Sequence, residues 1–74
     1  MVLSEAKAGD RLIIKKINGE NGFRARLSFM GLIENTKIKV IRFSPLGDPM
    51  QIYGRGFFMA IRKKNAADIE VEYE

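Results

Sequence analysis

The pattern of apolar and polar residues along the chain predicts short β-strands rather than long helices. The apolar segments are rich in β-branched and aromatic residues and are bounded by residues that favour turns, namely glycine, proline, asparagine and aspartate. Five segments meet this description, at residues 11–17, 37–43, 50–53, 57–61 and 69–74. In the last one Ile69, Val71 and Tyr73 alternate with three glutamates, which predicts a strand with one solvent-facing side.

Two of these segments carry signals for irregular backbone. In segment 37–43, Ile38 and Val40 share one face of a strand. Ile41 and Phe43 fall on the opposite face, so a bulge or burial of both faces is expected there. The tripeptide Gly54-Arg55-Gly56 separates the third segment from the fourth and predicts a hairpin whose glycines adopt positive φ.

Two short helices are also predicted. In residues 24–30 apolar side chains recur three and four positions apart, and Gly31 follows as a stop signal. Asn65 is placed to cap a single turn over residues 66–68. The expected fold class is all-β (mainly β), a small antiparallel β-barrel with one or two short helices, in which closure of the sheet removes exposed strand edges.

Length and composition restrict the chain to one domain and exclude most enzymes. The 74 residues, with 46% hydrophobic and 30% charged residues, are expected to form a single globular domain over 1–74. The longest apolar run, 57–61, is far shorter than the roughly 20 residues of a membrane-spanning helix, and no signal peptide is recognised, so a cytoplasmic location is expected. The absence of cysteine and histidine excludes disulfides, thiolate nucleophiles, histidine bases and Cys/His zinc sites. No catalytic residue and no cofactor are therefore assigned.

The net charge of +4 is unevenly distributed along the chain. Residues 1–64 contain all 13 lysines and arginines against five acids, a net charge of +8, whereas residues 65–74 contain four acids and no base. A basic body favours an anionic partner, which would be nucleic acid, an acidic protein face or the cytoplasmic surface of a membrane. Solubility alone would also account for a positive charge.

The most unusual motif is Pro45-Leu46-Gly47-Asp48-Pro49, between two predicted strands. Its prolines restrict the backbone, and the carboxylate of Asp48 can accept hydrogen bonds from nearby amides. A lone aspartate without a base, a metal or a nucleophile cannot catalyse hydrolysis or proton transfer. We therefore interpret the motif as a structured turn.

Together with other positions, this motif resembles the FeoA family. The resemblance runs from about Leu3 to Val71, and its most specific part is the Pro-Leu-Gly-Asp-Pro turn followed by an Ala-x-Arg strand end and a short helix. The other matching positions are Leu27, Met30-Gly31-Leu32, Ile38, Val40, Ala60-Ile61-Arg62, Ala66 and Ile69. One departure is Glu34-Asn35, where the family usually has a Pro-Gly-type turn; asparagine tolerates the left-handed conformation, so the turn is expected to persist.

The resemblance implies an SH3-like β-barrel and a role in bacterial ferrous iron uptake. FeoA proteins are small cytoplasmic components of this transport, and a similar barrel forms the C-terminal module of DtxR-type repressors. The chain would be a non-catalytic accessory protein that binds and modulates FeoB, a membrane transporter with a cytosolic GTP-binding domain. It would then be peripheral to the membrane through this partner. Its oligomeric state stays open, a homo-oligomer included.

Recognition often sits on loops that a rigid barrel holds in place, so the turn and the exposed part of the predicted helix are the candidate partner-binding surface. The residues assigned to it are Leu46, Gly47, Asp48, Arg26, Phe29 and Arg55. The alternative is that the turn only shapes a corner of the barrel. Phe57 and Phe58 are adjacent in a strand, so one of them points away from the core, as a partner anchor or as part of a crowded barrel end or a second buried layer.

A nucleic-acid-binding β-barrel is the alternative function. The residues available for phosphate contacts and stacking are Arg24, Arg26, Arg42, Arg55, Arg62-Lys63-Lys64, Phe23 and Tyr53. They form no motif of interleaved aromatic and basic residues, so no nucleic acid is expected as a partner. Measuring the affinity for single-stranded oligonucleotides at two salt concentrations would test this alternative, because binding through phosphate contacts weakens steeply as salt is raised.

Direct iron binding is a third interpretation, because ferrous iron accepts carboxylate ligands. Glu70, Glu72 and Glu74 share one face of the last predicted strand, but strand geometry separates them by about 7 Å. This spacing is wide for ligands of one ion, so no metal site is assigned. Transition metal ion binding, an attribute of the family, is thus not expected of the isolated chain, and a site at an oligomer interface stays open.

Overall fold

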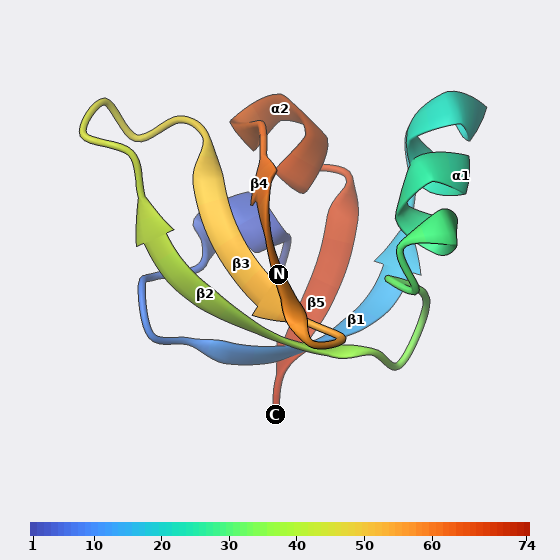
Figure 1. Cartoon of the computed structure of the whole chain (residues 1–74), viewed down its shortest axis with the longest axis horizontal. Helices are drawn as coiled ribbons and strands as arrows, with labels where there is room; N and C mark the ends of the chain where they lie inside the picture. Colours follow the sequence, from blue (N-terminus) through green and yellow to red (C-terminus); the bar gives the residue numbers. More distant parts are fainter.

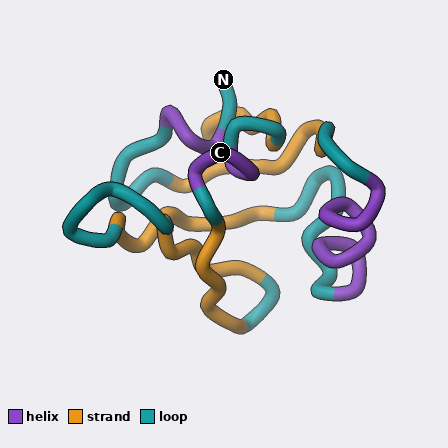
Figure 2. The backbone as a smooth tube through the Cα atoms, turned by 90° about the horizontal axis from the view of Figure 1, so that it is seen from above, coloured by secondary structure: helices purple, strands orange, loops and turns teal.

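Five antiparallel strands form one strongly curved sheet in the order β4-β3-β2-β1-β5 (Figure 1). This computed structural model describes residues 1–74. The strands are β1 (Arg11–Ile17), β2 (Lys37–Phe43), β3 (Met50–Gly54), β4 (Phe57–Ile61) and β5 (Ile69–Tyr73). The 3-10 helix η1 (Leu3–Glu5) precedes β1, and the helices α1 (Asn21–Phe29) and α2 (Lys63–Ala66) connect β1 to β2 and β4 to β5. The sheet bends around its concave face, with α1 standing at one side of the molecule (Figure 2).

The strands follow the sequence pattern closely. Segments 11–17, 37–43 and 57–61 are strands with the predicted bounds, the third strand extends to Gly54, and the last ends at Tyr73. The predicted irregularity in β2 is confirmed, because its pairing with β3 shifts register between Val40 and Arg42. A second register shift, in β1 opposite β5, was not predicted.

The core lies on the concave face of the sheet, to which alternate residues of each strand point. One cluster contains 14 buried apolar residues, and no polar or charged side chain is buried with them. Full burial of one such side chain as large as valine or leucine contributes about 1.5–3 kcal/mol. The strands supply Leu12, Ile14, Ile38, Val40, Met50, Ile52, Ile61, Ile69 and Val71, and the helices and loops supply Leu3, Ala6, Leu27, Leu32 and Ala66.

Closure of the sheet is incomplete, which corrects the expectation of a barrel without edges. β4 and β5 stand at the two ends of the strand order and do not pair with each other. The outer edge of β5 is covered in part by the start of the chain, since Val2 pairs with Glu70 and the Val71 N–H donates to the Met1 carbonyl at 2.8 Å. The outer edge of β4 has no strand beside it.

The helices differ from the sequence prediction at their N-terminal ends. α1 begins at Asn21, three residues earlier than predicted, and ends before Gly31, whose φ of +80° confirms the predicted stop. α2 spans Lys63–Ala66 instead of residues 66–68, so Asn65 lies inside the helix and the prediction that it caps the helix is wrong. The cap comes from a distant residue, because Asp48 Oδ1 accepts a hydrogen bond from the Lys63 N–H at 3.0 Å. Neither α-helix has the length and apolar character that crossing a membrane requires.

The turns show where the chain needs unusual backbone. Asn35 has a φ of 70°, so the predicted left-handed turn is present. In the β3–β4 hairpin the residues with positive φ are Arg55 and Gly56, at 55° and 88°, whereas Gly54 belongs to β3, which corrects its predicted role. Gly54 is required for space instead: a Cβ there would lie 2.9 Å from Ile38 Cγ2.

We expect Gly54→Ala to lower the free energy of unfolding by about 1–3 kcal/mol, because the added methyl group overpacks the space beside Ile38 and Leu32. Gly22→Ala in α1 is the matched control, since a Cβ there meets no other part of the molecule within 4 Å. Alanine also favours helix, so this control should be unchanged or more stable by up to about 1 kcal/mol. Urea unfolding of the three proteins measures both effects, and equal midpoints for the two variants would contradict the packing argument.

Candidate protein-binding surface

Two large apolar side chains project almost fully into solvent. Leu46, in the loop between β2 and β3, is 96% exposed, and Phe29, the last residue of α1, is 93% exposed. Neither belongs to the hydrophobic core, so the packing of the fold does not account for an apolar residue at either position. Both residues were assigned to the candidate surface from the sequence.

The loop that carries Leu46 is tied down on both sides of its tip. The Ser44 N–H donates to the Pro49 carbonyl at 3.0 Å, and the Gly47 N–H donates to the Ser44 carbonyl at 2.7 Å. The Asp48 carboxylate joins the loop to the first residue of α2. Asp48 therefore has a structural role at this corner of the fold, while the neighbouring Leu46 side chain is left free for contacts.

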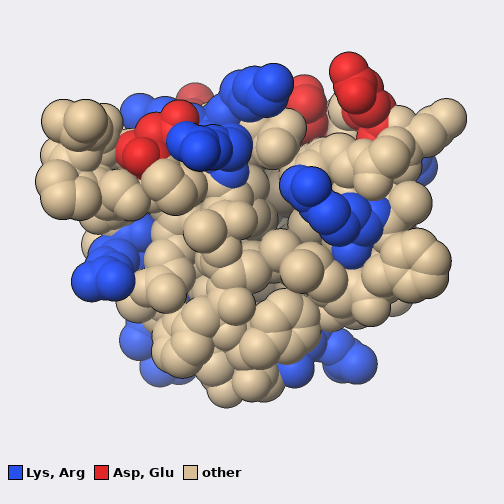
Figure 3. Space-filling view, turned by 45° about the horizontal axis from the view of Figure 1, so that its top comes forward, with Lys and Arg blue, Asp and Glu red and all other residues tan.

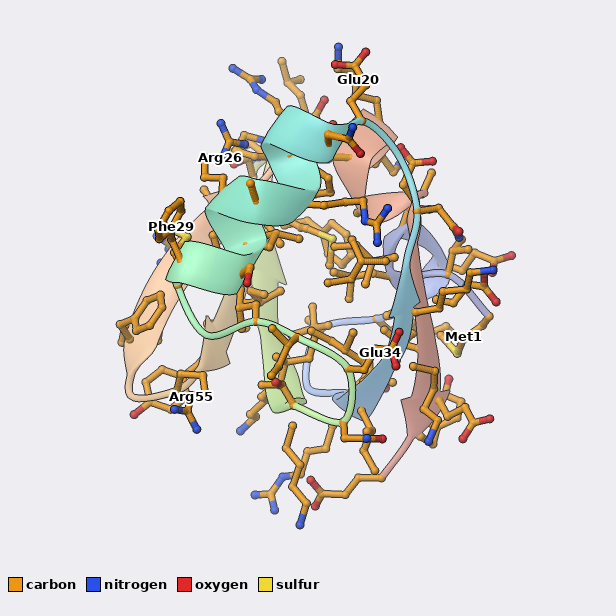
Figure 4. All side chains as sticks on the ribbon, turned by 90° about the vertical axis from the view of Figure 1, so that its right-hand side faces the viewer. Met1, Glu20, Arg26, Phe29, Glu34 and Arg55 are labelled. Carbon is orange, nitrogen blue, oxygen red and sulfur yellow. The ribbon has the colours of Figure 1, made fainter.

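The other assigned residues lie around the end of α1. The Arg55 side chain lies over Gly31, because a Cβ built on this glycine would be 3.0 Å from Arg55 Nε. The tip of the β3–β4 hairpin thus reaches the loop that follows α1, and Figure 4 shows Phe29 and Arg55 on the same side of the molecule. The guanidinium carbon of Arg26 lies 5.8 Å from the centre of the Phe23 ring, a cation–π contact.

The structure divides the six assigned residues into two groups. Leu46, Gly47 and Asp48 lie in a loop on one side of the molecule, and α1 stands on the opposite side in both Figure 1 and Figure 2. Arg26, Phe29 and Arg55 therefore form a second group and do not extend the first. The face shown in Figure 3 carries its lysines and arginines in several separate groups rather than in one basic patch.

A broad depression between α1 and β1 was not predicted. Its apolar lining consists of Ile17, Ala25, Leu32 and Ile33, which come from β1, α1 and the loop after α1. The depression exists only where these three elements meet in the folded chain. Local sequence patterns carry no information on how these elements meet, so they do not reveal the depression.

Phe58 is the member of the Phe57-Phe58 pair that points away from the core. Its side chain is 59% exposed, whereas Phe57 is half-buried. The Phe58 ring packs edge-to-face on Tyr53, its partner on β3, with ring centres 4.8 Å apart. The sequence prediction that one of the two rings faces outward is confirmed.

The glutamates of β5 are exposed, as the alternating pattern predicted. Glu70 accepts a hydrogen bond from Asn18 Nδ2 at 2.8 Å. Glu72 lies 3.9 Å from the Lys15 ammonium, an exposed ion pair of little energetic weight. Nowhere in the structure do three or more His, Cys, Asp or Glu side chains gather as they would around a metal ion.

The curved five-stranded sheet with two short helices is a small SH3-like β-barrel, which is the class that the resemblance implied. The model of the FeoA domain family matches residues 1–73. The chain therefore belongs to the FeoA family, whose members are involved in ferrous iron transport.

Similar proteins include one in which this domain is joined to a transporter. The chain is 36% identical over 72 residues to the Fe(2+) transport protein A/Fe(2+) transporter FeoB fusion protein of Porphyromonas gingivalis, and it spans 97% of its own length but only 8% of that protein. The solution structure of the FeoA protein from Chlorobium tepidum is 41% identical with a TM-score of 0.95, over 99% of this chain and 70% of that one. Stenotrophomonas maltophilia FeoA, solved in complex with zinc and described as a procaryotic SH3 domain protein, is 18% identical with a TM-score of 0.79, over 97% and 89% of the two chains. At this low identity the last comparison supports the fold alone.

Asp48→Ala tests the connection between the Leu46 loop and α2. Because the variant leaves the Lys63 N–H without its acceptor, we expect the free energy of unfolding to fall by about 0.5–2 kcal/mol, as for other helix-capping side chains. Glu34→Ala is the control, since the Glu34 side chain is exposed and makes no hydrogen bond or ion pair, and it should stay within about 0.5 kcal/mol of the wild type. Urea unfolding measures the difference. If both variants unfold at the same urea concentration, the hydrogen bond between Asp48 and the Lys63 N–H contributes nothing to stability.

Proposed function

We propose that this protein is a non-catalytic accessory protein of bacterial ferrous iron uptake that binds a FeoB-type GTPase transporter and modulates it at the cytoplasmic face of the membrane. The observation that carries the proposal is the Porphyromonas gingivalis relative, whose single polypeptide is named for both an iron transport protein A and a FeoB transporter. Fusion holds two domains at a high effective concentration, which favours an interaction between them. Where the two proteins are made as separate chains, a direct contact between them would serve the same purpose as the fusion.

Leu46 and Phe29 are the proposed apolar anchors of this contact. Large apolar and aromatic side chains supply much of the binding energy when a partner buries them. Each is exposed almost completely, so burial against a partner would remove nearly its whole side chain from water. Since the two anchors lie on different sides of the molecule, either they contact two parts of the transporter or one of them carries the binding.

Charge supports an acidic face on the partner. The net charge of +8 over residues 1–64 makes the body of the domain strongly basic. Arg26 and Arg55 lie on the same side as Phe29, so an apolar anchor is accompanied by cations that would favour carboxylates around it (Figure 4). Such complementarity accelerates association and is weakened by salt. Contact, rather than chemistry on a substrate, is therefore the proposed mode of action.

The binding of single-site variants to the detergent-solubilised FeoB-type transporter of the same organism tests this proposal. Leu46→Asp and Phe29→Asp each place a charge where a partner would bury an apolar side chain, and neither residue supports the core. We expect at least one of them to weaken binding about tenfold or more, as for an interface hot spot. Comparison of the two variants identifies which group of residues makes the contact.

Tyr73→Asp is the matched control, because Tyr73 is also an exposed aromatic residue, at 63%, but lies on the acidic strand β5. It should bind like the wild type. Unchanged affinity in all three variants would exclude both assigned groups as the interface. A wild-type protein that does not bind the transporter at all would overturn the proposed function itself.

A further inference from the structure

β4 is an unprotected edge of the sheet. All five of its residues, Phe57–Ile61, are apolar, and its pairing with β3 runs through five consecutive residue pairs without a bulge. Natural proteins usually guard an exposed edge with a charged residue, a proline, a bulge or a covering segment. β4 has none of the first three within its length, and no other strand or helix packs closely along it except β3.

The geometry of the hairpin shows which main-chain groups of β4 are free. Gly54 and Phe57 flank a two-residue turn, and in such hairpins the flanking residues form a hydrogen-bonded pair. Hydrogen-bonded and non-hydrogen-bonded pairs then alternate along the strands. The N–H and C=O groups of Phe58 and Ala60 therefore point away from β3, toward the open edge, and both residues are exposed.

The two outer edges of the sheet differ in this respect. Part of the outer edge of β5 is used internally, because Val2 pairs with Glu70 and Val71 bonds to Met1. Neither Phe58 nor Ala60 takes part in any main-chain hydrogen bond to a turn, a loop or a terminus. The open edge of β4 is thus the place where this sheet can accept another strand.

Basic residues flank β4 at both of its ends in the sequence. Arg55 precedes β4 in the turn, and Arg62, Lys63 and Lys64 follow it at the start of α2. If β4 paired with β4 of a second copy, cations would meet cations at both ends, in the parallel and in the antiparallel orientation. Like charges at these positions oppose self-pairing, whereas carboxylates at the ends of an added strand would be attracted.

We propose that β4 accepts an extended segment of a partner protein, apolar in its middle and acidic at its ends, as a sixth strand of the sheet. Main-chain hydrogen bonds to Phe58 and Ala60 would hold the segment, as in other cases of strand addition. The exposed Phe58 ring, packed on Tyr53, provides an apolar contact for its side chains on the convex face. The proposal goes beyond the proposed function, because it specifies an edge and a mode of binding that do not require the partner to be the transporter.

The experiment uses a defined probe, the capped peptide Glu-Glu-Val-Thr-Val-Thr-Val-Glu-Glu, added to the isotope-labelled protein and followed by NMR. We expect amide shift changes centred on β4 and slower hydrogen exchange of the Phe58 and Ala60 amides. The same peptide with lysine in place of every glutamate should bind at least about tenfold more weakly, since it would meet cations at both ends of the edge.

Ala60→Pro removes the free N–H without breaking a bond to β3, a change that edge strands tolerate. It should abolish binding of the acidic peptide, while Ala60→Ser, which keeps the N–H, should bind like the wild type. If the proline variant fails to fold, the double variant Arg62→Glu/Lys64→Glu replaces it and should remove the preference for the acidic over the lysine peptide, because Arg55 and Lys63 then balance the two added carboxylates.

Several results would overturn the proposal. Equal binding of the two peptides would show a purely apolar attachment, and shift changes centred on α1 would place the site elsewhere. Concentration-dependent broadening of β4 signals without peptide would identify a second copy as the occupant. Shift changes on β4 with a single-stranded oligonucleotide but not with the acidic peptide would assign the edge to nucleic acid.

Discussion

Apolar packing across the concave face of one curved sheet holds this protein together, and every other feature is attached to it. The chain has no cysteine, its buried set contains no polar side chain, and its single ion pair is exposed. Strand residues such as Leu12, Ile14 and Ile52 share this core with Leu27 of α1 and Ala66 of α2. The packing is close: at Gly54 of β3 there is no room for even a Cβ atom, which would lie 2.9 Å from Ile38 Cγ2.

This arrangement leaves the periphery to present the exposed features. The loop between β2 and β3 is fixed by its own hydrogen bonds and by Asp48, so Leu46 occupies a defined position although nothing covers it. On the other side, the contact between Arg55 and Gly31 joins the β3–β4 hairpin to the end of α1. The FeoA family and the fusion relative suggest that this domain acts by binding a partner protein. The parts of the surface available for such binding are the Leu46 loop, the end of α1 with Arg55, and the open edge of β4.

The sequence predicted the strands well because each strand carries its own information, an apolar run rich in β-branched or aromatic residues that ends at turn residues. The phase change after Val40 even located the register shift in β2. The failures share another cause: they depend on residues far apart in the chain. Asn65 was chosen as a cap for its position, whereas Asp48, 15 residues before the start of α2, provides the hydrogen bond. Likewise, the tripeptide at 54–56 indicated a turn, but only the packing against Ile38 shows why its first glycine is needed. The separation of the six assigned surface residues into two groups also depends on tertiary structure. No local sequence pattern predicts that α1 lies opposite the loop that carries Leu46.

The pairing of β1 with β5, and of Val2 with Glu70, brings the first and last segments of the domain side by side. During synthesis the sheet therefore cannot be completed until Tyr73 has left the ribosome, because Leu12 and Ile14 of β1 lack their pairing partners on β5 before then. Non-local pairing of this kind also makes folding slower than in helical proteins of the same size. A polypeptide that continues well past residue 74 would allow the domain to fold while still tethered to the ribosome, whereas one that ends there would complete its sheet only at release.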